Sequence, residues 1–272
     1  MAMRSIEQEN IILDLLMMPK YRDLGILEDT FRDVVAHEFL LHKSPSVAEK
    51  SARKKIHNIV ANYLGHPDYS LARNKLTAAF TSNDPENVKT ACIEILRTHV
   101  STSERLAEID TLYQKIFSVT GSPSSILDLA CGLNPFTFPW MGLPPETLYY
   151  AYDIVRPRID LINHFFTNQN MQPLAETRDI IVDPPTVTAD IALILKEIHR
   201  FEQRRKDSSY QLYSSLQVKF LVVSLPAQSI HSKHDFTRSY RALFFKTLHD
   251  CLWPVNEMII GQEMFFIIDK TG

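Results

Sequence analysis

Acidic residues at the ends of expected strands are the groups in this sequence best placed to do chemistry. Ile126–Ala130 is a short apolar run followed by Gly132, which predicts a buried strand that ends in a tight turn. In open α/β sheets a ligand binds outside the carboxyl ends of the strands, and an acid roughly 20 residues further on accepts from its ribose hydroxyls. Asp153 closes the next apolar run and occupies that position. The turn lacks the G-x-G-x-x-G pattern that cradles a pyrophosphate, so we expect a nucleoside cofactor without phosphates, of which S-adenosylmethionine (SAM) is the commonest.

The secondary structure expected around these acids changes at Gly121. Before it, from Ser5 to about Arg97, apolar residues recur at helical spacing with almost no glycine; after it, strands alternate with helices. Helices are expected at 26–41, 47–64, 69–80, 85–96, 158–167, 209–216 and 238–252. Strands are expected at 126–130, 148–152, 173–177, 191–195, 220–224, 258–261 and 264–268. This pattern predicts an α/β fold with a Rossmann-like, mostly parallel sheet whose last two strands are antiparallel.

Composition narrows the class of protein. The chain has 272 residues, of which 45% are hydrophobic, so it can bury a sizeable core. No apolar run approaches the roughly 20 residues that a membrane-spanning helix needs. Cys92, Cys131 and Cys251 match no C-x-x-C spacing, which indicates free thiols in a reducing compartment. We therefore expect a cytoplasmic protein that does not contact a membrane.

Basic residues gather in the first half of the chain although the net charge is -3. Lys50, Arg53 and Lys54 fall on one stripe of the helix expected at 47–64, so three cations point the same way and can straddle a phosphate backbone. The candidate RNA-binding residues are Lys43, Lys50, Arg53, Lys54, Arg73 and Lys75. A solvated helix face is the alternative interpretation of such a cluster.

A further helix is expected to begin at Ser101-Thr102-Ser103-Glu104, which offers a hydroxyl cap with an acid close behind it. Its apolar face would carry Leu106, Ile109, Leu112, Tyr113 and Ile116. The positive end of this helix and Arg105 would attract the carboxylate of the methionine part of SAM. By spacing alone, the alternative is that Arg105 pairs with a neighbouring acid such as Glu108.

Four segments of the sequence resemble one known family. They are His99–Glu108, Leu127–Pro135, the pair Asp153-Ile154 and Ser224–Ser229. In this order they are similar to the 16S ribosomal RNA guanine-N7 methyltransferases, which confer aminoglycoside resistance by methylating the ribosomal decoding site. The resemblance runs from about Lys20 to the C-terminus. It implies a class I SAM-dependent methyltransferase fold with an all-α RNA-docking domain at 1–104 and a SAM-binding domain at 105–272.

The resemblance also assigns residues to the two halves of the site. The cofactor-binding residues would be Tyr63, His99, Val100, Ser101, Arg105, Asp128, Ala130, Gly132, Asp153, Ile154, Asp179, Ile180 and Leu195. The residues at the target base would be Asn134, Lys196, Ser224, Pro226 and Ser229. Asp179 would accept from the adenine amine, although an Asp at a strand end is also an ordinary turn residue. Asp153→Ala is expected to leave the fold intact and to weaken SAM binding by about 1–3 kcal/mol.

No side chain is nominated as a catalytic acid or base. Guanine N7 carries a free in-plane lone pair, so its attack on a methyl group requires no proton removal and positioning suffices. Lys196 has two interpretations that the sequence leaves open: a structural ion-pair partner, or a group that approaches the target base.

Two segments depart from the family's pattern. Glu197-Ile198-His199 replaces the residues that follow Leu-Lys in the family, and His231–Phe236 stands where the family has a glycine-rich loop. His231, His234 and Asp235 do not make a metal site on this spacing, and no metal is expected. The function expected is N7 methylation of the decoding-site guanine of 16S rRNA within the 30S subunit. The alternatives are methylation of another RNA site or a small molecule, and a non-catalytic SAM-binding protein associated with the ribosome.

Overall fold

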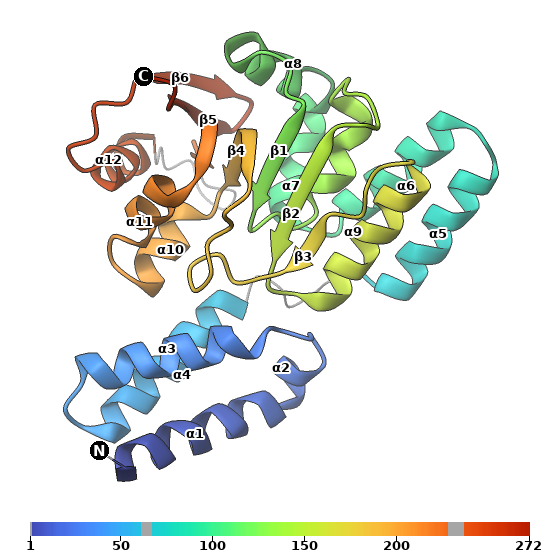
Figure 1. Ribbon diagram of the computed structural model, residues 1–272. Coiled ribbons are helices and arrows are strands. Elements are labelled where there is room, and N and C mark those ends of the chain that lie inside the picture. The colour runs from blue at the N-terminus through green and yellow to red at the C-terminus, as the bar shows by residue number, and fades with distance from the viewer. Residues whose placement is uncertain (1, 61–66, 228–236) are drawn as a thin grey trace.

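A seven-stranded sheet lies at the centre of the computed structural model, which describes residues 2–60, 67–227 and 237–272 (Figure 1). Its spatial order is β3-β2-β1-β4-β5-β7-β6. The strands are β1 Ser125–Leu129, β2 Leu148–Asp153, β3 Ala175–Thr177, β4 Thr188–Leu195, β5 Gln217–Pro226, β6 Val255–Ile260 and β7 Glu263–Asp269. The first five strands pair in parallel, and β7 is antiparallel to both β5 and β6. The predicted sheet is therefore confirmed, with β3 shorter than expected.

Most helices of the described residues fall into three groups. The N-terminal bundle consists of α1 Ala2–Met17, α2 Pro19–Arg22, α3 Glu28–Leu41 and α4 Pro45–Val60. One face of the sheet carries α5 Tyr69–Thr81, α6 Pro85–Leu96, α8 Ile109–Thr120, α9 Arg156–Asn168 and the 3-10 helix η3 Asn134–Trp140. The other face carries α10 Ile198–Arg204, α11 Ser208–Ser215 and α12 Thr237–Thr247. Helices on both faces of a mostly parallel sheet are the α/β arrangement that the sequence predicted.

Side chains of β1 alternate between the two faces of the sheet, so this one short strand contributes to the cores on both faces. Ile126 belongs to the core that includes residues of α5, α6, α8 and α9, whereas Leu127 and Leu129 belong to the core that includes residues of α10, α11 and α12. Successive side chains of a strand point to opposite faces, so an almost wholly apolar strand is the expected sequence when both faces are covered. On the second face Phe244 stacks on Phe266 with ring centroids 3.9 Å apart.

The hydrophobic cores place the boundary between the two packing units closer to residue 60 than to residue 104, where the family resemblance ends the first domain. The bundle has a core of its own, in which Phe31, Val35, Phe39 and Ile56 are buried. Helices α5 and α6 instead share the core of the sheet. The first four helices therefore form the packing unit that is separate from the sheet, and α5 and α6 belong with the sheet.

The bundle is fastened to the carboxyl ends of β2 and β3, beside which it lies (Figure 1). The backbone N–H of Leu27 donates to the carbonyl of Ile154 at 3.0 Å, and Ile26 forms an isolated bridge with Val155. In the opposite direction, the backbone N–H of Arg156 donates to the carbonyl of Gly25 at 3.2 Å. The bundle is thus held at the edge where the sequence places a ligand.

Several expected helices need correction. The expected helix from Ser101 to Phe117 is broken into α7 Val100–Arg105, a 3-10 turn Leu106–Glu108 and α8. The cap is also wrong, because His99 precedes α7 and the Ser101 hydroxyl bonds to the His99 ring rather than to a backbone N–H. Helix α12 ends at Thr247 instead of Leu252, and α10 was not expected. No helix among the described residues is long and apolar enough to cross a membrane.

Candidate functional site

Two neighbouring strand ends carry strained backbone at the same edge of the sheet. Ala130 follows β1 with φ +53°, and Lys196 follows the adjacent β4 with φ +63°. Residues other than glycine rarely adopt this left-handed region, and such strain gathers at binding and catalytic sites. Gly132 in the same turn has φ +55°, and a Cβ added there would meet no atom of the described residues within 4 Å. The turn therefore leaves open space directly beside its backbone.

The carboxylate of Asp153 organises this turn. Its Oδ2 accepts from the backbone N–H of Gly132 at 3.0 Å and from the guanidinium of Arg158 at 2.8 Å, and its Oδ1 accepts from the N–H of Val155 at 3.0 Å. The side chains of Asp153 and Arg158 are 1% and 0% exposed. A carboxylate offers about four acceptor positions, so the three donors among the described residues leave room for one more. The structure adds a buried arginine partner that the spacing of Asp153 did not reveal.

A pocket beside this turn collects most of the predicted residues on the adenosine side. Its lining includes Ala130, Asp153, Ile154, Asp179, Ile180, Ile181, Glu197, Phe201 and Arg204, together with Ile59 of the bundle helix α4. Ile180 and Phe201 are buried apolar side chains, which suit the faces of a purine. The pocket therefore takes its walls from three strand ends, from α10 and from the N-terminal bundle.

Asp179 faces the bundle with its acceptor positions filled. Its Oδ2 accepts from the hydroxyl of Thr30 at 2.7 Å and from Arg204 at 2.7 Å. Its Oδ1 accepts from the N–H of Ile181 at 3.1 Å and from the same Arg204 nitrogen at 2.9 Å. The expected bond from Asp179 to an adenine amine would have to displace one of these donors.

A second buried cluster joins the ends of β4, β5 and β7. Arg105 binds the carboxylate of Glu263 in a fork, at 2.9 and 2.8 Å, and the ammonium of Lys196 lies 3.3 Å from Glu263 and 2.5 Å from Glu104. The hydroxyl of Ser224 donates to Glu263 as well. The acid partner of Arg105 is thus Glu263, 158 residues away, and not the neighbouring Glu108. Of the two interpretations of Lys196, the structure shows the ion pair.

Asn134 links this cluster to Asp128. Its side-chain amide donates to Asp128 at 2.9 Å, and its oxygen accepts from the hydroxyl of Tyr113 at 2.9 Å. The hydroxyl of Tyr149 also donates to Asp128, at 2.7 Å. Burial raises the pKa of Asp128 to about 7, and the two donors only partly oppose it. Asp128 is therefore a buried member of the network that supports the turn.

The pKa of Asp128 leads to a prediction for stability. Burial raises the pKa of Asp128 in the folded state. The stability that the neutral acid contributes is therefore fully present below its pKa in the unfolded chain, about 4, and is lost as the pH rises through the folded pKa of about 7. Asp128→Asn, which cannot ionise, should therefore gain stability relative to the wild type between about pH 5 and about pH 8, on the order of 1–3 kcal/mol. Urea unfolding of both proteins at the two pH values measures the difference. Parallel pH curves would contradict the buried, raised acid.

Comparison with known proteins decides the family. A family model described as "Ribosomal RNA methyltransferase (FmrO)" matches residues 19–268. The chain belongs to this family. A 16S rRNA (guanine(1405)-N(7))-methyltransferase of Serratia marcescens is 31% identical over 262 residues, which cover 96% of this chain and 98% of that protein. One of the same name from Micromonospora echinospora is 30% identical over 227 residues, or 82% of each chain.

Solved structures of rRNA methylases share the fold of this methyltransferase family member. The 16S rRNA methylase RmtB is similar with a TM-score of 0.76 and 29% identity, covering 97% of this chain and 98% of that one. An rRNA methylase from Escherichia coli is similar with a TM-score of 0.73 and 30% identity, covering 97% and 100%. The class I methyltransferase fold and the family expected from the sequence are therefore confirmed.

The remaining predicted residues of this methyltransferase lie at varied places. Leu195 is buried at the end of β4, Pro226 ends β5, and Val100 is 62% exposed at the start of α7. Tyr63, Ser229 and the loop His231–Phe236 fall outside the described residues. Among the residues that are described, no group of three or more His, Cys, Asp or Glu side chains could hold a metal ion.

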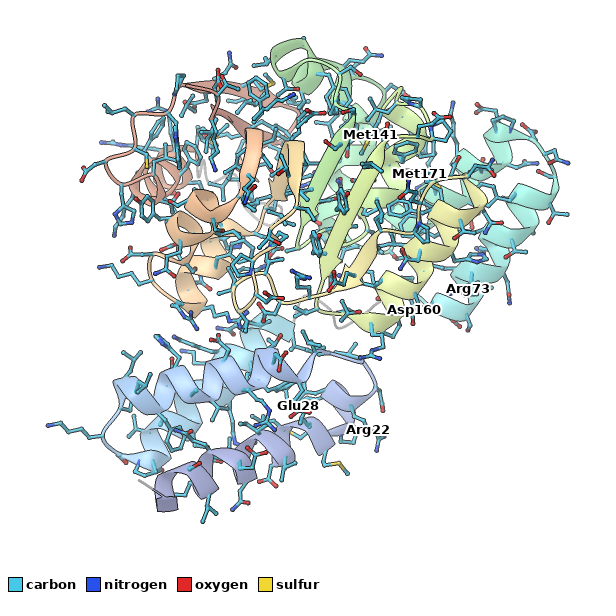
Figure 2. The ribbon with its side chains drawn as sticks, in the orientation of Figure 1. Arg22, Glu28, Arg73, Met141, Asp160 and Met171 are labelled. Atoms are coloured by element: carbon cyan, nitrogen blue, oxygen red, sulfur yellow. The ribbon has the colours of Figure 1, made fainter. Side chains whose placement is uncertain are left out.

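The predicted RNA-binding cations of this methyltransferase separate into two sets. Lys43, Lys50 and Lys54 are exposed on the bundle, whereas Arg53 pairs with Glu49 at 2.8 Å. The other two lie on α5, away from the bundle. There Arg73 donates to the carbonyl of Asp160 at 3.0 Å (Figure 2), and Lys75 pairs with Glu94 at 2.5 Å. The exposed surface of α4 is therefore the better candidate for contact with phosphates.

Sequence reasoning missed the charged partners that hold this methyltransferase's site. They are Glu104, Arg158, Arg204 and Glu263. The sequence held one signal for Glu263, an acid between the apolar runs of the last two strands. In the structure its side chain is almost wholly buried, which an acid tolerates only with a partner. Its partners come from distant parts of the chain, so spacing could not identify them.

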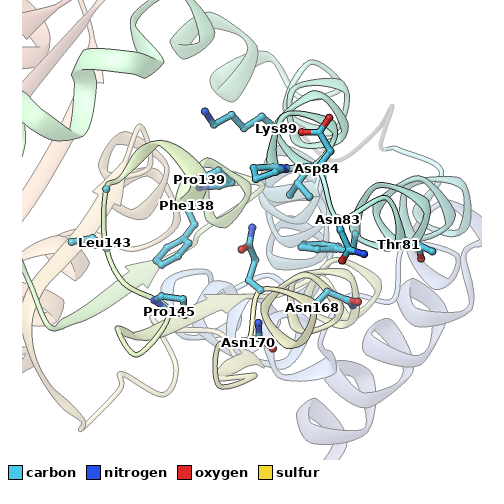
Figure 3. A pocket seen from close by; sticks show the side chains of 15 residues that line it. Thr81, Asn83, Asp84, Lys89, Phe138, Pro139, Leu143, Pro145, Asn168 and Asn170 are labelled. Carbon is cyan, nitrogen blue, oxygen red and sulfur yellow. The ribbon is translucent and has the colours of Figure 1, made fainter.

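A wider pocket lies away from these residues. It encloses about 610 Å3 between the end of α5 and the segment from Phe138 to Pro145, next to the end of α9 (Figure 3). Of the predicted site residues that the structure describes, none lines it. It adjoins the segment that enters β2, and so lies at the amino ends of the strands, whereas ligands of this fold bind at the carboxyl ends. Size alone therefore does not identify the cofactor site in this methyltransferase.

Proposed function

We propose that this protein methylates N7 of the decoding-site guanine of 16S rRNA in the 30S subunit, with SAM as the methyl donor. The observation that carries the proposal is the position of two buried sites at one edge of the sheet. The pocket at Asp153 and Ile154 adjoins the strained turn, and the cluster around Arg105 and Glu263 lies at the next strand ends. Together with the family and the names of the curated relatives, this arrangement favours rRNA methylation over the alternatives.

The chemistry of these residues suits the adenosine part of SAM, and the pocket, which encloses about 50 Å3, must widen to admit it. The remaining acceptor position of Asp153 suits a ribose hydroxyl, the open space at Gly132 lets a ligand approach the backbone, and Ile180 with Phe201 suits a purine face. At the other end of the site, Arg105 would hold the methionine carboxylate through Nη1, since Nε and Nη2 bind Glu263 and Nη1 lies 3.5 Å from the side-chain oxygen of Asn134. SAM supplies a methyl group on a positively charged sulfur.

The protein's part in this reaction is positioning. Guanine N7 is a hydrogen-bond acceptor with a free lone pair, so no side chain has to remove a proton from it. The family resemblance places Asn134, Lys196 and Ser224 at the target base. Lys196 and Ser224 contact Glu263 directly, and Arg105 joins Asn134 to the same carboxylate, so the three belong to one network of charges and hydrogen bonds that forms a wall of the site. A rigid wall that fixes the base against the donor can supply several kcal/mol of the barrier. The target base must also leave its stack before it can enter the site.

Methyl transfer from labelled SAM tests the function. Purified 30S subunits should accept label from this protein, and primer extension after reductive cleavage should stop at the decoding-site guanine. A clean stop elsewhere would favour an enzyme for another RNA site. Binding of SAM without incorporation into subunits, free RNA or small molecules would favour the non-catalytic protein. Because the substrate is a ribosomal subunit, we place this reaction in the cytoplasm.

The exposed lysines of α4 should govern docking on the subunit. Lys50→Glu with Lys54→Glu should weaken 30S binding by at least about tenfold at moderate salt and reduce its salt dependence, because phosphate contacts release counterions. The affinity for S-adenosylhomocysteine should stay unchanged. The control reverses two exposed cations of the sheet body, Lys206 and Lys246, and should retain binding. Equal losses in both double variants would show that only net charge matters.

A further inference from the structure

The N-terminal bundle and the adenosine side of the pocket are joined by a group of buried and partly buried charges. We call Thr30, Asp33, Asp179, Arg204 and Arg205 the Arg204 cluster. Arg204 is 8% exposed and lies between two acids, with 2.7 Å to Asp33 of α3 and 2.7 Å to Asp179 at the end of β3. Arg205 also pairs with Asp33. Two acids thus face two arginines, so the cluster is neutral as a whole while each member depends on its partners.

The cluster also fixes the wall of the pocket. Arg204 is the last residue of α10, and Phe201, one turn earlier on the same helix, lines the pocket together with Ile180 and Ile181. The N–H of Ile181 donates to Asp179, so the turn that carries both isoleucines is held by the same carboxylate. Any displacement of Asp179 would therefore move two sides of the purine pocket at once.

The bundle supplies one donor, Thr30, and one acceptor, Asp33, to this cluster. The hydroxyl of Thr30 donates to Asp179 at 2.7 Å, and Asp33 accepts from Arg204 at 2.7 and 3.1 Å. Neither residue belongs to the lining of the pocket. The carbonyl of Arg204 accepts from Lys55 of α4 at 2.9 Å, which adds a second helix of the bundle. The pocket's shape is thus tied to a body whose exposed lysines are proposed to dock on RNA.

We propose that Arg204 is a positioning residue, which holds Asp179 and the adenosine pocket in shape only while the bundle is seated on the sheet. This inference rests on the proposed function, and it assigns to Asp179 a role other than direct recognition of the adenine amine. The occupant of the pocket is the adenosine part of SAM or of S-adenosylhomocysteine. Because binding free energies are linked reciprocally, occupancy of the pocket and seating of the bundle strengthen each other.

Substitutions in the bundle that do not touch the pocket test this role. Thr30→Val keeps the shape of the side chain and removes the hydroxyl, so S-adenosylhomocysteine should bind about tenfold more weakly by calorimetry. Thr30→Ser keeps the hydroxyl and should bind within about twofold of the wild type. Asp33→Asn should resemble Thr30→Val. Arg32→Gln, which breaks an ion pair inside the bundle with Glu9, is the matched control and should leave affinity unchanged.

Kinetics and a double-mutant cycle separate positioning from loss of folded protein. With 30S subunits, Thr30→Val should raise KM for SAM about tenfold and leave kcat at saturating SAM unchanged, whereas partial unfolding would lower kcat. Asp33→Asn combined with Arg204→Gln should bind no more weakly than Arg204→Gln alone, because both act through one contact. Folded Thr30→Val and Asp33→Asn that bind as tightly as the wild type would overturn the inference. A wild type that fails to bind S-adenosylhomocysteine would overturn the proposed function instead.

Discussion

Replacing Asp153 with alanine will lower the free energy of unfolding by about 3–5 kcal/mol, the loss expected when one partner of a buried ion pair is removed. Arg158 is left without its acid at a position that water cannot reach, since its side chain is 0% exposed. The backbone N–H groups of Gly132 and Val155 lose their acceptor as well. This result would correct the simpler expectation that Asp153→Ala leaves the fold intact, which treated Asp153 as a ligand-binding acid alone.

Urea unfolding measures this loss, and two further variants identify its cause. Asp160→Ala removes an exposed acid from the same helix, α9, and should change stability by less than about 0.5 kcal/mol. Asp153→Ala with Arg158→Leu should recover part of the loss, because no uncompensated charge remains. If Asp153→Ala unfolds within about 1 kcal/mol of the wild type, the pair with Arg158 is not a buried ion pair in solution. Calorimetry on the folded fraction should still show weaker SAM binding.

Glu263→Gln will have an effect of similar size at the other end of the site, again about 3–5 kcal/mol of unfolding free energy. The substitution leaves the cations of Arg105 and Lys196 with only Glu104 as an acid among the contacts described. Methyl transfer to 30S subunits should fall with it, since the same carboxylate holds Arg105, Lys196 and Ser224 in place. The matched control is Glu257→Gln on β6, whose surface pair with Arg241 should contribute less than about 1 kcal/mol.

The pH dependence of the wild type and Glu263→Gln gives an independent check. Burial by itself would raise the pKa of Glu263, but the charges of Arg105 and Lys196 outweigh it and hold the pKa below its usual value. The stability contributed by this carboxylate is therefore present above the unfolded value of about 4.3 and is lost as the pH falls through the lower folded value. The wild type should lose this part of its stability in acid, and Glu263→Gln should not. Equal acid sensitivity of the two proteins would contradict the buried pair.

Local sequence rules predicted the positions of most elements because they act over short distances. Helix α6 begins and ends at the predicted residues, and β1 is displaced by one residue. The helix expected from Ser101 fails for a tertiary reason. The hydroxyl of Thr102 donates to the carbonyl of Leu96, and Arg105 is drawn into the fork with Glu263, so the chain turns at Leu106 before α8 begins. Long-range partners overrode a favourable cap.

The sequence by itself determined the family, the order in which acidic residues follow successive strands, and the edge of the sheet where the site forms. Asp128, Asp153 and Asp179 could be placed at that edge because each lies in a predicted strand or within two residues of its end. Only the tertiary structure decided what those carboxylates bind. Arg158 forms an ion pair with Asp153. Arg204 and Thr30 both donate to Asp179, and burial raises the pKa of Asp128. The reason is physical: a local pattern specifies backbone direction and which face is apolar, whereas the cost of burying a charge is met by whichever opposite charge the packed chain brings near it.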